Sequence, residues 1–112
     1  MTIFERVIAG EFGTEFIYQD DRVVAFRDIH PQAPVHVLVV PRRALPGVSH
    51  ATPEDAALLG HVLVVASEVA RREGVAAGGY RLVINDGANG GQTVPHLHVH
   101  VLGGRAMGWP PG

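Results

Sequence analysis

The sequence predicts an α+β domain, in which an antiparallel sheet of about five strands packs with one long and one short helix. Apolar and turn-forming segments follow one another in the order α–β–β–β–α–β–β. The segment 52–74 carries clear helix start and stop signals, and two β-rich runs flank a tight turn near the N-terminus. No linker or internal repeat divides the 112 residues. We therefore expect one domain, 1–112, with a C-terminal tail over 103–112.

The first element is a short helix. Thr2 can serve as its N-cap, and Gly10 marks the place near which it ends. Its apolar residues recur at helical spacing and are Phe4, Val7 and Ile8.

Three strands follow. The runs 15–19 and 22–28 flank the Asp20-Asp21 turn and predict a hairpin. The prolines of 30–34 end the second run. The segment 35–41 is almost wholly apolar, which is typical of a central strand buried on both faces, and His36 is its polar interruption.

The long helix is predicted from its ends as well as from its apolar pattern. Thr52 is the N-cap, Pro53 takes the first helical position, Asp55 completes a capping box, and Gly74 ends the helix. The helix carries a broad apolar stripe, wider than one small sheet needs, which consists of Leu58, Leu59, Val62, Leu63, Val65, Ala66 and Val69.

The last third of the chain predicts two further strands. Residues 80–86 form the first, the glycine-rich segment 87–92 forms a turn, and 95–104 form the last strand. The remaining residues, 105–112, form an irregular tail.

Composition limits the classes of function. A formal net charge of −2 gives neither a basic footprint for duplex nucleic acid nor a polybasic membrane patch. No cysteine is present, so a metal site would need histidine and carboxylate ligands alone. The first residues lack the features of a signal peptide, and no apolar run approaches the roughly 20 residues that span a bilayer. We expect a cytoplasmic protein.

Three histidines, His96, His98 and His100, occupy alternate positions of the last strand and share one face of it. At about 3.4 Å per residue, the outer two lie roughly 13 Å apart. One zinc ion, which binds nitrogen at about 2.1 Å, could take two of them but hardly all three, and His36 is the natural donor from a neighbouring strand. A plain exposed polar face and a structural, hydrogen-bonded His36 are the alternatives.

Nucleophilic catalysis is a third possible role for the row of histidines His96, His98 and His100, besides metal binding and a plain polar face. Neutral imidazole is a nucleophile near pH 7 and forms covalent phosphoryl or nucleotidyl adducts. The preceding turn supplies glycines that let backbone N–H groups approach an anion, and Gln92 and Thr93 add side-chain donors. Together the turn and the row predict a phosphate site.

The segment "PHLHVHVLGGR" fits the pattern His-φ-His-φ-His-φ-φ, with φ apolar, and so resembles the histidine triad (HIT) family of nucleotide hydrolases and transferases. The likeness extends to "DDRVVAFRDIHPQAPVHVLVVPR", "LLGHV" and "YRLVINDGANGGQTV", and covers nearly the whole chain. The ending "GGRAMGWPPG" resembles the Hint branch, the adenosine phosphoramidases.

The resemblance implies a role for each histidine. His98 would be the nucleophile on the α-phosphorus, and His100 would contact phosphate. His96 would steady the strand and the tautomers of its neighbours. His36 would complete the relay from the adjacent strand.

It also implies substrate contacts. Asp28 would bind the ribose hydroxyls, and Phe26, Ile29, Phe4 and Val7 would enclose the purine. The residues at the phosphate end would be Asn85, Gly91 and Thr93, beside Gln92. Many relatives carry serine in place of Thr93, and His30 and Gly108 also depart from the usual pattern; His30 would lie solvated at the pocket rim.

By this resemblance the protein is a homodimer whose sheet continues across the interface of the long helix and strand 80–86, with the Trp109 tail near the partner's site. It would hydrolyse purine nucleoside 5′-phosphoramidates, and also acyl-nucleotides, to mononucleotides such as AMP and GMP, with no metal or other cofactor. A dinucleoside polyphosphate hydrolase and a nucleotide-binding regulatory module with vestigial turnover are the alternatives. A zinc hydrolase is the least favoured, because the chain has no cysteine and no His-Glu-x-x-His pattern.

Overall fold

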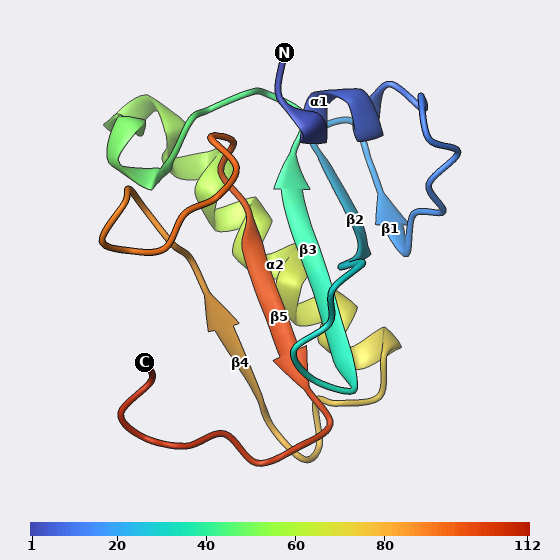
Figure 1. The fold of residues 1–112 in the computed structure, drawn as a ribbon. Coiled ribbons are helices and arrows are strands. Elements are labelled where there is room, and N and C mark those ends of the chain that lie inside the picture. The colour runs from blue at the N-terminus through green and yellow to red at the C-terminus, as the bar shows by residue number, and fades with distance from the viewer.

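The computed structural model describes all residues, 1–112, and has the predicted α+β architecture. Five strands form one antiparallel sheet in the order β1-β2-β3-β5-β4. Helix α2 crosses one face of this sheet, while α1 lies against the other face near one end of β3 (Figure 1). The bounds of the elements are α1 Ile3–Ile8, β1 Tyr18–Gln19, β2 Val23–Arg27, β3 Val35–Pro41, α2 Ala56–Arg72, β4 Tyr80–Val83 and β5 Val99–Gly103.

The two core clusters follow from the alternation of side chains along β2 and β3. Val23 and Val39 face α2 and belong to the larger cluster, whereas Val24 and Leu38 face the opposite side and pack with α1. Strand β3 is therefore buried on both faces, as its apolar sequence predicted. The α1 side of the sheet, with its smaller cluster, is the side on which the histidines lie.

Both helices begin as predicted. The Thr2 hydroxyl accepts the Glu5 N–H at 3.1 Å, and the Glu5 carboxylate accepts the Thr2 N–H at 2.8 Å, which makes a capping box. At the long helix, the Asp55 carboxylate accepts the Thr52 N–H at 2.9 Å, after which a single 3-10 turn, Pro53–Asp55, leads into α2.

The apolar stripe on α2 is wider than the sheet can cover, as the sequence predicted. Val62, Val65, Ala66 and Val69 are buried against the sheet, but Leu63 is 45% exposed. Leu63 and its neighbour Val64, which is 63% exposed, point away from the core. The sheet has only five strands, several of them short, and leaves this side of the helix uncovered.

The predicted last strand, 95–104, begins only at Val99. Val39 pairs with Val99, so continuation of the same register would place Leu97 opposite Pro41. Pro41 has no N–H to donate, and the Leu97 N–H instead binds the Leu45 carbonyl oxygen at 2.7 Å. His96 and His98 thus precede the strand, and of the histidine row only His100 lies within it.

The remaining predicted strands are also shorter than their sequence runs. Strand β1 keeps two residues of 15–19, and β4 stops at Val83, which pairs with His100 at the start of β5. The tail is irregular, as expected, and Trp109 is 83% exposed. Neither helix has the length and apolar character needed to cross a membrane.

Candidate active site

A cavity of about 550 Å³ opens on the α1 side of the sheet. Its floor comes from β2, β3 and β5, and its walls come from α1, the loop after it and the segment that leads into β5. The predicted residues that line it are Phe4, Val7, Phe26, Asp28, Ile29, Thr93, His98 and His100. The structure thus brings the expected base-binding residues and two of the expected catalytic histidines to one place.

Other lining residues were not among the predicted ligands, and these are Ile3, Phe12, Thr14, Arg27, Leu38 and Val94. Ile3 and Leu38 belong to a predicted helix and a predicted strand, so the face of the element on which each lies could have indicated that it lines the cavity. Phe12 and Thr14 lie in a loop with no periodic pattern, and nothing in the sequence places that loop over the sheet. His30, expected at the rim, also lines the cavity and is exposed.

Several predicted ligands lie outside the lining, namely Asn85, Gly91, Gln92 and Trp109. The amide of Gln92 donates to the Pro46 and Val94 carbonyl oxygens at 2.8 and 3.0 Å and accepts the Gly87 N–H at 2.9 Å. All of its donors are therefore engaged within the turn, where they hold the backbone beside Thr93.

The hydrogen bond of His98 defines its tautomer. Nδ1 lies 2.7 Å from the carbonyl oxygen of His96, which can only accept, so Nδ1 carries the proton. Nε2 of the neutral ring is then a free lone pair. Burial lowers the pKa of His98, and the positive charge of a protonated His96 would lower it further, while the His96 carbonyl opposes this shift. The ring is therefore neutral and nucleophilic at pH 7.

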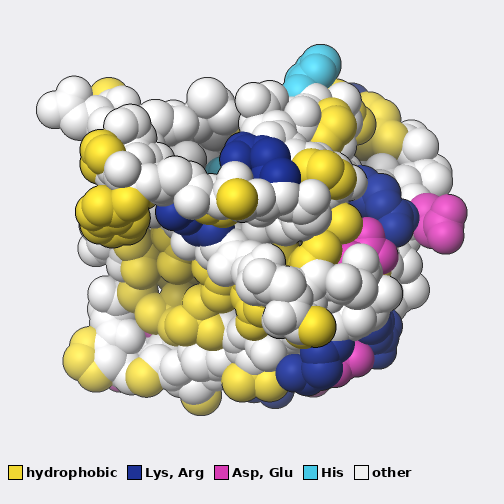
Figure 2. Space-filling model, turned by 90° about the horizontal axis from the view of Figure 1, so that it is seen from below, with side chains coloured by type: hydrophobic (Ala, Val, Ile, Leu, Met, Phe, Trp, Pro, Cys, Tyr) yellow, Lys and Arg dark blue, Asp and Glu magenta, His cyan; other side chains and the backbone are white.

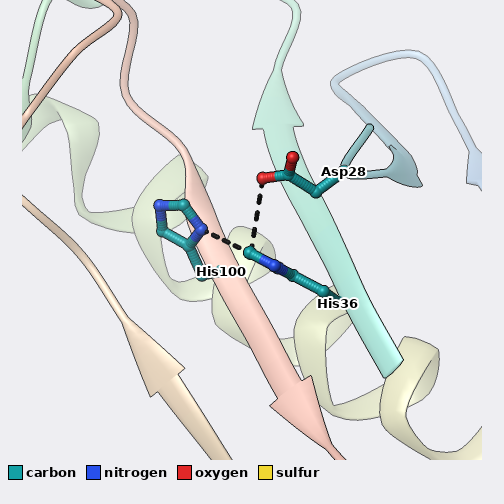
Figure 3. Close-up of side chains that lie close together, drawn as sticks. All are labelled: Asp28, His36 and His100. Carbon is teal, nitrogen blue, oxygen red and sulfur yellow. Dashed lines mark hydrogen bonds and ion pairs between the residues drawn. The ribbon is translucent and has the colours of Figure 1, made fainter. Parts of the chain in front are cut away.

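His36 and His100 face each other across β3 and β5 (Figure 3). The Gln32 backbone N–H donates to His36 Nδ1 at 3.0 Å, so the neutral ring carries its proton on Nε2. That atom lies 2.9 Å from His100 Nδ1. His100 Nδ1 therefore accepts, and the proton of His100 sits on Nε2, where it can be donated to an anion.

Burial also lowers the pKa values of His36 and His100. The pKa of His100 falls to about 4, because burial is reinforced by the nearby rings of His98 and His36. Asp28 opposes these shifts for both residues. Its Oδ2 lies 3.4 Å from His36 Nε2, and its Oδ1 accepts the His30 backbone N–H at 2.8 Å.

His96 is fully buried and lies beside the cavity rather than in it. Its Nε2 is 2.8 Å from the Pro41 carbonyl oxygen, and its Nδ1 is 3.0 Å from the Thr2 hydroxyl. Both ring nitrogens are therefore used within the fold.

Asp28, His36 and His100 have potential metal-ligating atoms within 4.8 Å of one another. A histidine that binds a metal normally donates its other ring N–H to a neighbour. His36 Nδ1 instead accepts a backbone N–H, so Nε2 would have to lose its proton and leave an imidazolate before it could bind a metal. The donor chemistry of this cluster suits a hydrogen-bonded relay better than a metal centre.

The five-stranded antiparallel sheet, the single long helix and the four clustered histidines define a small α+β protein with a histidine-based site. The profile of the HIT domain matches residues 9–107, and the chain belongs to the HIT family.

Known proteins resemble the chain over most or all of their length. The chain is 56% identical over 111 residues to an uncharacterised HIT-like protein of Synechocystis, covering 99% of this chain and 96% of that one. It is 50% identical over 113 residues to a 14 kDa zinc-binding protein of Zea mays, covering 99% and 88%. The crystal structure of a HIT family hydrolase from Legionella pneumophila superposes with a TM-score of 0.96 at 41% identity, covering all of both chains.

Proposed function

We propose that the protein hydrolyses purine nucleoside 5′-phosphoramidates to the nucleoside monophosphate and an amine, through a covalent nucleotidyl-histidine intermediate. One observation carries the proposal: the 2.7 Å hydrogen bond from His98 Nδ1 to the His96 carbonyl oxygen. Because of this bond the lone pair on His98 Nε2 is free, and His98 lines the apolar cavity.

The shape and lining of the cavity support a nucleotide as the ligand. Phe4 and Phe26 are buried and pack edge to face at 5.7 Å, which gives a rigid apolar wall for a purine. Asp28 lies at the same cavity, where its carboxylate can accept ribose hydroxyl protons. We place the phosphate between the base slot and the pair His98 and His100.

In the first step, His98 Nε2 attacks the α-phosphorus in line and the P–N bond to the amine breaks. The amine leaves with a proton from the hydroxyl of Thr93, which lines the same cavity as His98. His100, protonated on Nε2, donates to a non-bridging phosphate oxygen and stabilises the developing charge. Water then attacks the adduct and gives its proton to the Thr93 oxygen, the P–N bond to His98 breaks, and the mononucleotide is released with neutral His98 and the Thr93 hydroxyl restored.

The solved relatives support the hydrolase class. The Legionella pneumophila and Clostridium thermocellum structures are both described as HIT family hydrolases. A dinucleoside polyphosphate hydrolase is the enzyme alternative, and the "GGRAMGWPPG" ending argues against it. A regulatory nucleotide binder would not need His36, His96, His98 and His100 together.

The Zea mays relative is a zinc-binding protein, but the hydrogen bond that His36 Nδ1 accepts disfavours zinc at this site. Metal analysis of the purified protein decides this, because about one zinc per chain with chelator-sensitive activity would favour a zinc hydrolase. The proposed reaction itself is tested by assaying AMP-linked amines beside diadenosine polyphosphates. Faster turnover of the polyphosphates would select the alternative.

We also propose a homodimer. Strand β4 is an edge of the sheet with no partner on its outer side, and Leu63, Val64 and Ile84 expose apolar side chains. Figure 2 shows apolar side chains around a hollow at the left of the view, the side on which Figure 1 has β4 and the C-terminus. Antiparallel pairing of two β4 edges about a two-fold axis would continue the sheet and bury these side chains.

A further inference from the structure

We infer that Thr2 is a positioning residue for the nucleophile and acts through the ring of His96. The inference rests on the proposed function, because it takes His98 as the nucleophile. It adds a residue from the N-terminus of the chain, 94 positions from His96 in sequence, to the machinery of the site.

The hydrogen bonds around His96 have one consistent set of directions. Its Nε2 lies 2.8 Å from the Pro41 carbonyl oxygen, which can only accept, so Nε2 carries the proton and Nδ1 is a lone pair. The Thr2 hydroxyl accepts the Glu5 N–H at 3.1 Å and lies 3.0 Å from Nδ1. A hydroxyl can donate its one proton and still accept hydrogen bonds. The Thr2 hydroxyl therefore donates to His96 Nδ1 while it accepts the Glu5 N–H as the cap of α1.

Loss of this hydroxyl would leave a buried nitrogen without a partner. His96 is fully buried, so water cannot replace Thr2 without opening the site. The ring would then turn or shift to satisfy Nδ1, and the backbone of His96 would shift with it.

That backbone holds the nucleophile. The His96 carbonyl oxygen accepts the His98 Nδ1 proton at 2.7 Å and so exposes the lone pair on Nε2. His96 precedes β5, which begins at Val99, so no strand ladder fixes this carbonyl. The His96 carbonyl is instead held in place by two sets of hydrogen bonds. One set joins the His96 ring to Thr2 and Pro41, and the other is formed by the backbone of this segment.

The same threonine is also tied to the cavity wall. Thr2 is the N-cap of α1, and Phe4 and Val7 of that helix line the cavity. The Phe4 ring lies 6.0 Å from the His96 ring and 4.9 Å from the His98 ring, centroid to centroid. Thr2 therefore links two parts of the site: helix α1, which forms the wall proposed to receive the base, and His96, whose carbonyl orients the ring of His98.

The test compares three variants with the wild type. Thr2→Val keeps the shape and removes the hydroxyl, Thr2→Ser keeps the hydroxyl, and Thr52→Val is the matched control at the N-terminus of the long helix. We expect Thr2→Val to lower kcat for an adenosine 5′-phosphoramidate about tenfold, the effect of one neutral hydrogen bond, with the Kd for AMP within about twofold. Thr2→Ser should restore kcat, and Thr52→Val should change only the melting temperature. If Thr2→Val instead raised KM at constant kcat, Thr2 would act only as a helix cap, and the inference would be overturned.

Nitrogen-15 NMR of the histidine rings in the free protein supplies a readout that does not depend on turnover. The wild type should show His98 in the single tautomer protonated on Nδ1, and Thr2→Val should show a mixture that Thr2→Ser does not. A single, unchanged His98 tautomer in Thr2→Val would overturn the inference whatever the rates. A wild type that binds AMP but does not hydrolyse the phosphoramidate would instead refute the proposed function, and the NMR comparison would still decide the role of Thr2.

Discussion

His36 and His100 share one hydrogen bond, with Nε2 of His36 2.9 Å from Nδ1 of His100, and it joins β3 to β5 beneath the cavity. Its direction is set by the Gln32 backbone N–H, which occupies the other nitrogen of His36. A second proton on His100 would have to sit on Nδ1, the atom that accepts from His36. The pair is therefore built for its neutral state, in agreement with the lowered pKa values of both rings.

The first prediction is that the protein loses stability in mild acid. The ordinary pKa of histidine, about 6.5, applies to the unfolded chain, whereas the pKa of His100 in the folded protein is about 4. The unfolded state thus binds more protons between these values. The stabilising contribution is complete above about pH 6.5 and is lost as the pH falls through about 4.

Denaturant unfolding at pH 7, 5.5 and 4.5 measures this effect. Replacement His100→Asn should reduce the loss of unfolding free energy over this range by an amount on the order of 2 kcal/mol. Equal slopes for His100→Asn and the wild type would contradict the assigned pKa shift.

Removal of the nucleophile should separate binding from turnover. His98→Ala should abolish phosphoramidate hydrolysis yet leave the affinity for AMP within about tenfold, because Asp28 and the apolar slot remain. Calorimetry with AMP and a product assay with an AMP-linked amine measure the two properties. Hydrolysis near the wild-type rate would remove His98 from the role of nucleophile.

Asp28→Asn tests two roles of one carboxylate. Loss of charge-assisted hydrogen bonds to the ribose, worth roughly 1.5–3 kcal/mol, should narrow the preference for ribonucleotides over 2′-deoxynucleotides. Asp28 also holds up the pKa values of His36, His98 and His100, so its neutralisation should move the acid limb of the kcat profile to lower pH. An unchanged sugar preference together with an unmoved acid limb would make Asp28 a structural residue.

Assembly is tested at the exposed side of α2. Wild-type protein should sediment as a dimer at micromolar concentration, about twice the chain mass of 11.9 kDa. Val64→Asp should shift the equilibrium to monomer, while Val48→Asp, at an exposed valine outside α2 and β4, should not. A wild type that stays monomeric would refute the proposed interface.

Local sequence signals predicted the elements of this fold well because each was decided by nearby residues. The Thr2 and Thr52 capping boxes and the glycine at position 74 determine the helices from within a few residues. The late start of β5 was missed because it depends on Pro41, which lies opposite Leu97 only after the chain has folded. The width of the apolar stripe indicated that part of the helix face would stay uncovered, but helical periodicity does not show which residues the sheet leaves exposed, here Leu63.

The site was partly predictable. Alternation along 96–100 indicated that the histidines act together, but the tautomers depend on backbone partners such as Gln32 and the His96 carbonyl, which no residue pattern reveals. Gln92 could equally have faced a phosphate or its own turn, and the structure shows its amide bonded within the turn. Phe12 reaches the cavity only through the path of an irregular loop.

The most direct test of covalent catalysis by His98 is the stereochemical course at phosphorus. In-line attack by His98 inverts the centre, and in-line attack by water on the adduct inverts it again, so the account predicts net retention. Direct attack by water, with the histidines acting only as bases or metal ligands, would give a single inversion. An adenosine phosphoramidate made chiral at phosphorus by sulfur and hydrolysed in oxygen-18 water reports the outcome. Retention is the predicted result, and clean inversion would contradict the covalent intermediate.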